Sequence, residues 1–172
     1  MNTFVIGPGV PNLSEIGILF HSKQQLSLSE AAIQAIEHSQ AFLLEKISGE
    51  KAAVYGVNTG FGALYLATLQ HKLVQSHACG MGNAVPAEVV KMMLLLKIIS
   101  LSQGYSGVAL QTVQRLIDLY NLDILPLVYE QGSLGASGDL APLAHLSLPL
   151  IGLGEVLYKG RKRNAAEVLD EL

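Results

Sequence analysis

The segment QGSLGASGDLAPLAH, residues 131–145, places Ser137 between two small residues, in a glycine-rich stretch ahead of an apolar run. A nucleophilic serine on a G-x-S-x-G turn is disfavoured, because Asp139 stands where that motif has its second glycine and no strand pattern precedes the loop. A phosphate-binding loop is a weak alternative, because the sequence lacks G-x-x-x-x-G-K-[ST] and has no lysine nearby. A flexible loop in which Ser137 or Asp139 caps the next helix fits the spacing well.

The triplet Ala136-Ser137-Gly138 also permits a fourth chemistry. In a tight bend, the amide nitrogen of Gly138 can attack the carbonyl carbon of Ala136, and small residues at both ends leave the ring atoms uncrowded. Loss of one water closes an imidazolone, and loss of a second water from Ser137 leaves an exocyclic methylidene. The product would be an electrophile made from the chain itself. Spacing alone leaves the capping role and this chemistry open.

The segments that must position this loop show mainly helical periodicity. We expect helices over residues 27–49 (opened by a capping box in which Glu30 follows Ser27), 66–79, 83–104 (with Pro86 near the first turn), 106–121, from about 141 with a kink at Pro149, and over 164–172. The first 26 residues indicate short extended pieces joined by Gly and Pro turns, residues 52–57 a short strand, and residues 158–163 a turn. The predicted fold class is mainly α, with short N-terminal strands and glycine-rich loops.

The composition excludes several classes of protein. Half of the 172 residues are hydrophobic, 15% are charged, and the formal net charge of −3 argues against a nucleic-acid partner. The mean hydropathy of +0.39 indicates large surfaces buried against further chain or other subunits. One cysteine, Cys79, excludes a disulfide framework and a cysteine-rich zinc module, and favours a reducing compartment. The apolar run 140–153 is too short for a membrane span, and we expect no signal peptide.

Three further stretches accompany the loop, namely YGVNTGFG (55–62), LQHKLVQSHACGMG (69–82) and GYSGV (104–108). Together with residues 132–156 they resemble, in order and spacing, the aromatic amino acid ammonia-lyases, the family of histidine, phenylalanine and tyrosine ammonia-lyases. The resemblance covers residues 26–172. It implies a large helical-bundle lyase in which residues 55–62 form the catalytic tyrosine loop and residues 132–140 the prosthetic-group loop.

The resemblance also implies roles for individual residues. Ala136, Ser137 and Gly138 would form a 4-methylidene-imidazol-5-one group, without a metal. Tyr55 would be the base that removes the β-proton of the substrate, and its phenol, with an ordinary pKa of about 10, would need a lowered pKa. Gly62 matches a substrate-contacting position. Taken in isolation, Tyr55 is more typical of a half-buried strand residue, and Gly62 is typical of a turn.

Ser76 and His77 match the pair that helps to choose the substrate ring in this family. Ser-His resembles histidine ammonia-lyases, although some tyrosine-specific members share it. A polar pair suits a polar ring, because a buried donor needs its hydrogen bond. The implied reaction is therefore the conversion of L-histidine to urocanate, with tyrosine as the alternative substrate. Leu140 matches a position that packs near the substrate ring, and is equally typical of a core residue.

The other histidines indicate less. On a helix, His77 alone would be an ordinary core residue, and its six-residue spacing from His71 does not suit two metal ligands on one face. We expect His145 to have a core or supporting role. We expect His21, His38 and the basic run 159–163 to lie at the surface.

Family members are much longer than 172 residues. We therefore expect residues 1–172 to be the N-terminal segment of such a lyase, without its C-terminal helical body. The resemblance implies that the parent enzyme is a cytoplasmic homotetramer of histidine degradation, with sites that mix residues from several subunits. For the segment alone we expect neither activity nor ring formation. A non-catalytic helical interaction module that kept the loops is the alternative from another class of function.

Overall fold

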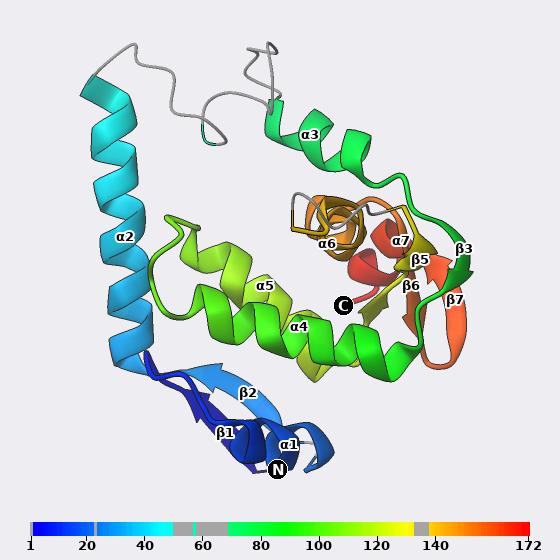
Figure 1. Cartoon of the computed structure of the whole chain (residues 1–172), viewed down its shortest axis with the longest axis horizontal. Helices are drawn as coiled ribbons and strands as arrows, with labels where there is room; N and C mark the ends of the chain where they lie inside the picture. Colours follow the sequence, from blue (N-terminus) through cyan, green and yellow to red (C-terminus); the bar gives the residue numbers. More distant parts are fainter. Residues whose placement is uncertain (1, 23, 50–56, 58–68, 133–137) are drawn as a thin grey trace. The chain divides into compact units, whose positions relative to one another are not determined.

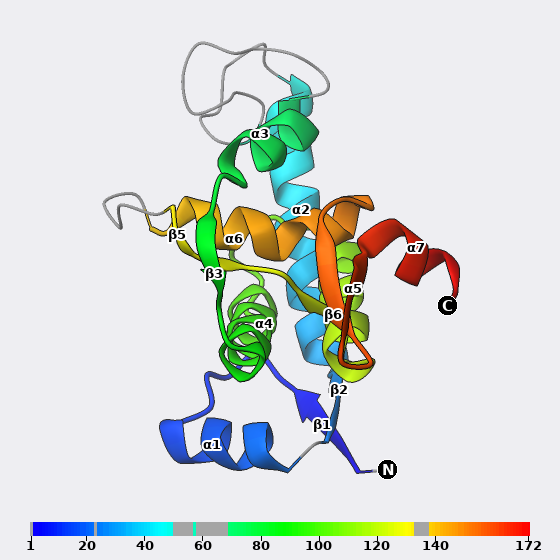
Figure 2. The ribbon, with the colours of Figure 1, turned by 90° about the vertical axis from the view of Figure 1, so that its right-hand side faces the viewer.

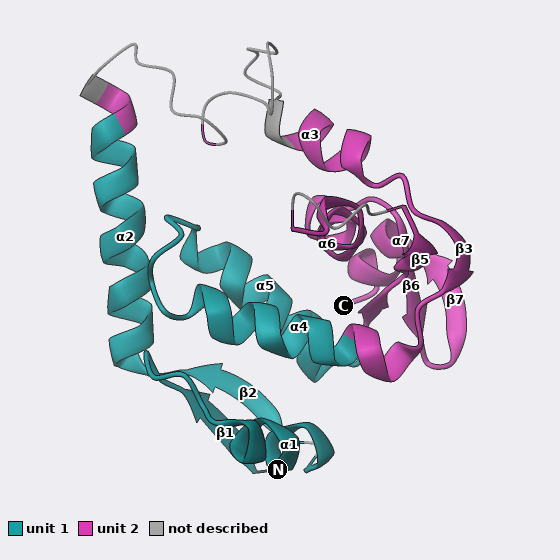
Figure 3. Ribbon diagram, in the orientation of Figure 1, with its two compact units in different colours: residues 1–46, 91–123 teal, residues 47–90, 124–172 magenta. Residues whose placement is uncertain are grey.

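A computed structural model describes residues 2–22, 24–49, 57, 69–132 and 138–172. The chain divides into two units, residues 1–46 with 91–123 and residues 47–90 with 124–172 (Figure 3). The helix α4 (Ala87–Leu101) contributes its first turn to the second unit and the rest to the first. Each unit is therefore built from two stretches that are separate in the sequence.

The first unit combines a small parallel sheet with helices (Figure 1). Its elements are β1 (Thr3–Ile6), α1 (Leu13–His21), β2 (Gln25–Leu28), α2 (Glu30–Gly49), most of α4, and α5 (Leu110–Asn121). The strands β1 and β2 pair in parallel, Thr3 with Gln25 and Ile6 with Leu28. The carboxamide of Asn121 at the end of α5 bonds both backbone groups of Leu26, at 2.7 Å to the N–H and 3.0 Å to the carbonyl. This amide ties the sheet to α5.

The core of the first unit follows from the helical periodicity of the sequence. In α5 the buried side chains of Val113, Leu116, Ile117 and Tyr120 recur every three or four residues, so they form one apolar stripe. The turn between α4 and α5 approaches α2 closely, since a Cβ on Gly104 would lie 2.6 Å from the backbone of Ala35. Glycine is required there, because its φ of +73° is also left-handed.

The second unit contains α3 (Leu69–His77), β3 (Met81–Ala84), β4 (Leu125–Pro126), β5 (Tyr129–Gln131), α6 (Leu140–Ser147), a 3₁₀ helix η1 (Leu148–Ile151), β6 (Glu155–Tyr158), β7 (Arg161–Asn164) and α7 (Ala165–Asp170). The strands β3 and β5 form an antiparallel pair, and β4, β6 and β7 form an antiparallel sheet in that order. The helix α3 packs against α6, as both views show (Figures 1 and 2). This packing brings together the two helices that carry described site residues.

The mainly helical fold class is confirmed, as are the helices expected near residues 27–49, 66–79, 83–104, 106–121, 141 and 164–172. The helix predicted to bend at Pro149 changes instead into η1 at Leu148. The short strand predicted over residues 52–57 lies outside the described residues, apart from Val57 in a turn. No helix in the described part of the chain has both the length and the apolarity that crossing a bilayer requires.

Two local predictions were wrong, and a third was confirmed in part. Ser27 lies in β2, and the cap of α2 is Ser29, whose Oγ accepts the N–H of Ala32 at 3.1 Å. The sequence from Asn12 to Glu15 starts a further helix, α1, because the two side chains cap each other's backbone N–H at 3.0 and 2.8 Å. The turn expected over residues 158–163 is confirmed at Lys159 and Gly160, the tip of the β6–β7 hairpin, whereas residues 161–163 belong to β7 because they pair with β6.

The hydroxyl of Tyr120 is a buried, unsatisfied polar group in the described part of the first unit. The residue is 3% exposed, and within the described residues its hydroxyl has no hydrogen-bond partner. The ammonium of Lys91 lies 5.2 Å from the ring centroid and pairs with Asp123 at 2.6 Å. Burial, and then the charge of Asp123, raises the pKa of Tyr120 above its ordinary value.

We therefore expect Tyr120→Phe to raise the free energy of unfolding by about 1 kcal/mol, because an unpaired buried hydroxyl costs free energy. Because the pKa of Tyr120 is raised in the folded state, the phenol ionises first in the unfolded state. The free energy of unfolding of the wild type should therefore fall as the pH rises above about 10. The advantage of phenylalanine should therefore grow in alkali. Denaturant unfolding from neutral pH upward measures both effects, with the 92% exposed Tyr105 changed to Phe as the control. A clear loss of stability at neutral pH in Tyr120→Phe would contradict the prediction.

Candidate active site

Of the eight predicted site residues, four are described. Ser76 and His77 lie in the last turn of α3, Gly138 precedes α6, and Leu140 is the first residue of α6. All four belong to the second unit. The remaining four, Tyr55, Gly62, Ala136 and Ser137, lie outside the described residues, so their roles stay predictions.

Ser76 and His77 are held by the carbonyl group of Leu73, one turn earlier in α3. The Nδ1 atom of His77 lies 2.8 Å from this carbonyl oxygen, and Ser76 Oγ donates to the same oxygen at 3.0 Å. A carbonyl oxygen can only accept, so Nδ1 carries a proton and, in the neutral ring, Nε2 carries the lone pair. The helix thus sets the tautomer of His77.

The backbone just before α6 is left-handed at two successive residues. Gly138 has φ +85° and Asp139 has φ +58°. A Cβ on Gly138 would meet nothing within 4 Å, so the described surroundings do not crowd this glycine. The residue therefore fits the glycine position of an Ala-Ser-Gly ring, where an uncrowded, conformationally free backbone is needed.

The sequence predicted that Ser137 or Asp139 caps the helix after the loop, and for Asp139 this prediction was wrong. Asp139 occupies the N-cap position of α6, but its side chain makes no capping hydrogen bond. Its left-handed backbone explains this, because a capping side chain normally accompanies an extended N-cap residue. The other candidate, Ser137, lies outside the described residues.

Four residues of the second unit meet where α3, β5 and α6 come together, and we call them the Gly80 junction: Gly80, Tyr129, Gly132 and His145. The N–H of Gly80 donates to Nε2 of His145 at 2.9 Å. The Tyr129 ring packs edge-on to the imidazole, with centroids 5.2 Å apart. The imidazole is thereby fixed from two sides.

Two glycines of the junction leave no room for a side chain. A Cβ on Gly80 would lie 2.9 Å from Nε2 of His145, and a Cβ on Gly132 would lie 2.8 Å from Cα of Gly80. Gly132 also has φ +139°, in the region that favours glycine. The sequence analysis missed both positions, although their glycines lie within the motifs at residues 69–82 and 132–156.

His145 is 8% exposed, which confirms its predicted core position. Burial lowers the pKa of His145 below its ordinary value, so the neutral ring is favoured. A backbone N–H can only donate, so Nε2 must carry the lone pair and Nδ1 the proton. His21 and His38 are exposed, and the basic run 159–163 is exposed or half-buried, as predicted. His71, for which no position was predicted, is also exposed.

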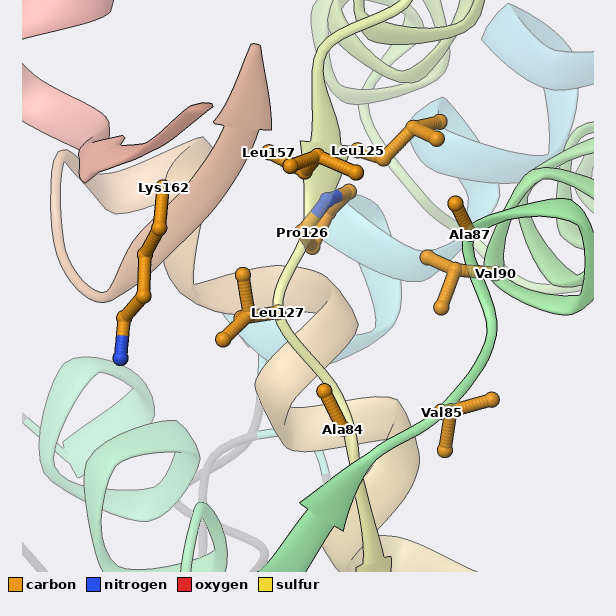
Figure 4. A pocket seen from close by; sticks show the side chains of 9 residues that line it. All are labelled: Ala84, Val85, Ala87, Val90, Leu125, Pro126, Leu127, Leu157 and Lys162. Atoms are coloured by element: carbon orange, nitrogen blue, oxygen red, sulfur yellow. The ribbon is translucent and has the colours of Figure 1, made fainter. Parts of the chain in front are cut away.

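An apolar pocket of about 240 Å³ lies elsewhere in the second unit (Figure 4). Its lining residues are Ala84, Val85, Ala87, Val90, Leu125, Pro126, Leu127, Leu157 and Lys162. The ammonium of Lys162 pairs with Glu155 at 2.7 Å. No predicted site residue lines this pocket. In the described part of the chain, no three His, Cys, Asp or Glu side chains gather closely enough to hold a metal ion.

Comparison with known proteins identifies relatives over nearly the whole chain. The profile of the family described as aromatic amino acid lyase matches residues 12–172. A histidine ammonia-lyase of Deinococcus radiodurans is 49% identical over 169 residues, covering 94% of this chain and 32% of the relative. A histidine ammonia-lyase of Legionella pneumophila (strain Lens) is 46% identical over 174 residues, covering 96% of this chain and 34% of the relative. The chain thus spans about one third of the length of these relatives.

Solved structures agree with this assignment. Histidine ammonia-lyase from Trypanosoma cruzi superposes with a TM-score of 0.84 at 30% identity, over 99% of this chain and 34% of the other. Phenylalanine aminomutase from Pantoea agglomerans gives 0.87 at 28% identity, over 99% of this chain and 34% of the other. Ergothionase from Treponema denticola gives 0.90 at 24% identity, over 99% of this chain and 35% of the other, which shows a shared fold alone.

The Gly80 junction yields a stability prediction. We expect Gly132→Ala to lower the free energy of unfolding by roughly 2 to 4 kcal/mol. The added Cβ would collide with backbone atoms, and the alanine backbone would be strained at this positive φ. Gly160→Ala is the matched control, since Gly160 has φ +73° but a Cβ there meets nothing within 4 Å. Its loss should be about 1 to 2 kcal/mol, from backbone strain alone. Equal losses in denaturant unfolding of the two variants would contradict the close packing at Gly132.

Proposed function

The chain belongs to the aromatic amino acid lyase family, and we propose that it supplies the N-terminal part of an enzyme that eliminates ammonia from L-histidine to give urocanate. The observation that carries this proposal is the match to histidine ammonia-lyases, at 49% and 46% identity, through a region that contains both Ser76-His77 and Ala136-Ser137-Gly138. In the whole enzyme, the loops 55–62 and 132–140 would belong to the active site.

The residues Ala136, Ser137 and Gly138 would provide the prosthetic group. The open, left-handed backbone of Gly138 supports this, because ring closure needs a small and unhindered residue at that position. A methylidene-imidazolone formed there would supply an electrophile for the loss of an amine, which is by itself a poor leaving group. Tyr55 would take the β-proton of the substrate, and Gly62 would let the backbone approach the substrate.

Ser76 and His77 would recognise the substrate ring. Because Nδ1 of His77 is bonded to the Leu73 carbonyl, Nε2 would be the acceptor nitrogen of the neutral ring. A lone pair suits a substrate ring that carries an N–H donor, which an imidazole has and a phenyl ring lacks. A phenolic hydroxyl can also donate, so tyrosine is the second candidate substrate. Leu140, at the start of α6, would pack against the ring.

The rest of the proposal concerns the whole protein. We propose a cytoplasmic homotetramer that acts in histidine degradation, with sites completed by the remaining helical body and by neighbouring subunits. The 172-residue chain alone would then be inactive. It would also keep ordinary Ala136, Ser137 and Gly138, because strained backbone costs about 1 to 3 kcal/mol per residue and persists only where surrounding structure holds it.

The first test uses Ser137→Ala in the full-length lyase that contains this chain. Alanine cannot lose the water that leaves the methylidene, so urocanate formation should be nearly abolished and intact mass should not show the loss of two waters. The free energy of unfolding should change little, by at most about 2 kcal/mol. Ser100→Ala, at an exposed position of α4 outside both loops, is the control and should retain both the modification and the activity. Wild-type turnover in Ser137→Ala would refute the assignment of the electrophile.

The second test addresses the substrate. His77→Leu should lower kcat/KM for histidine by roughly tenfold or more relative to phenylalanine, because a site without its polar partner loses discrimination for a polar ring. His71→Leu, at an exposed position of the same helix, is the control and should leave the ratio unchanged. A proportional fall of kcat/KM for histidine, tyrosine and phenylalanine in His77→Leu would assign His77 a structural role instead.

A further inference from the structure

We infer that His145 is a positioning residue of the proposed lyase, holding the end of α3 that carries Ser76 and His77 at a fixed place relative to the start of α6. The inference rests on the proposed function, and it extends that function to a residue outside the predicted active site. Its basis is the hydrogen bond from the Gly80 N–H to Nε2 of His145, 2.9 Å long, between residues 65 apart in sequence.

The first step concerns which chain segments meet at the imidazole. Gly80 lies three residues beyond His77, the last residue of α3. Gly132 is the last described residue before segment 133–137, and α6 begins at Leu140 just after it. Gly132 packed on Gly80, and the bond from Gly80 to His145, therefore connect the end of α3 both to the residue before that segment and to the helix after it.

The second step concerns why histidine suits this position. An acceptor is needed for the Gly80 N–H, because this part-buried donor would lose free energy without a partner. The neutral imidazole provides that acceptor at Nε2. The Tyr129 ring packs edge-on to the imidazole, at a centroid distance of 5.2 Å and an interplanar angle of 72°. His145 is 8% exposed, so little water is available to replace the bond. Both the hydrogen bond and the ring packing therefore depend on this side chain.

The third step concerns rigidity. A Cβ at Gly80 would lie 2.9 Å from Nε2 and 3.1 Å from Cβ of Tyr129, so the backbone of Gly80 already sits as close to the imidazole as glycine allows. A rigid contact of this kind transmits any displacement of α6 to the end of α3. Since catalysis is sensitive to misplacement of binding groups, the junction should matter for substrate binding through the position of Ser76 and His77.

The contact itself is tested in the 172-residue chain by hydrogen exchange of the Gly80 amide. His145→Gln keeps an acceptor oxygen on a side chain of similar reach, whereas His145→Leu removes the acceptor and keeps apolar packing. Relative to wild type, exchange should be roughly tenfold faster or more in His145→Leu and nearly unchanged in His145→Gln. Should His145→Leu not fold, His145→Met takes its place. Equal exchange in all variants would overturn the inference.

The positioning role is tested in the full-length lyase with the same variants. His145→Leu should still lose two waters by intact mass, while KM for histidine rises roughly tenfold or more and kcat falls less. His145→Gln should restore KM to near the wild-type value. The inference is overturned if Gln and Leu impair KM alike, or if neither changes it. Failure of the proposed function is recognised separately, because the wild-type enzyme itself would then form no urocanate.

Discussion

The N–H of Gly80 donates a hydrogen bond to an imidazole 65 residues further along the chain, and this bond connects the end of α3 to α6. It requires His145 to be neutral, which burial favours. It requires glycine at position 80, because a Cβ would collide with the imidazole, and glycine at position 132, because a Cβ there would collide with Gly80. The packing around one bond between a backbone donor and a ring acceptor thus restricts the residue type at three separate positions of the chain.

The helices could be predicted because their signals are local. The three- and four-residue recurrence of apolar residues in α5 reports which face is buried, whatever the partner. Caps are harder to place, since Ser27 and Ser29 both precede apolar helical residues, and the choice of Ser29 follows from the pairing of β2 with β1. The mutual capping of Asn12 and Glu15 is a local signal that could have predicted α1 from the sequence.

The candidate site was predictable to a different extent. The motifs correctly identified the family, whereas the roles of Ser76 and His77, which were assigned by their position in a motif, stay predictions. The tautomer of His77 depends on a carbonyl group within its own helix, and the geometry could be inferred once α3 was known. The bond between Gly80 and His145 is set by tertiary packing and leaves no periodic trace. Sequence reasoning therefore assigned His145 to the core without its partner.

The amide clamp of Asn121 on Leu26 has a consequence for how the chain is made. The two residues are 95 apart in sequence, and the first unit is interrupted by residues 47–90 of the second. At roughly 5 to 20 residues per second on the ribosome, the backbone of β2 waits on the order of 5 to 20 s before its clamp is synthesised. During that interval the paired β1 and β2 lack the side chain that later occupies both backbone groups of Leu26. During synthesis, the backbone N–H and carbonyl groups of Leu26 are therefore without the Asn121 amide, and this strand edge is available to a chaperone.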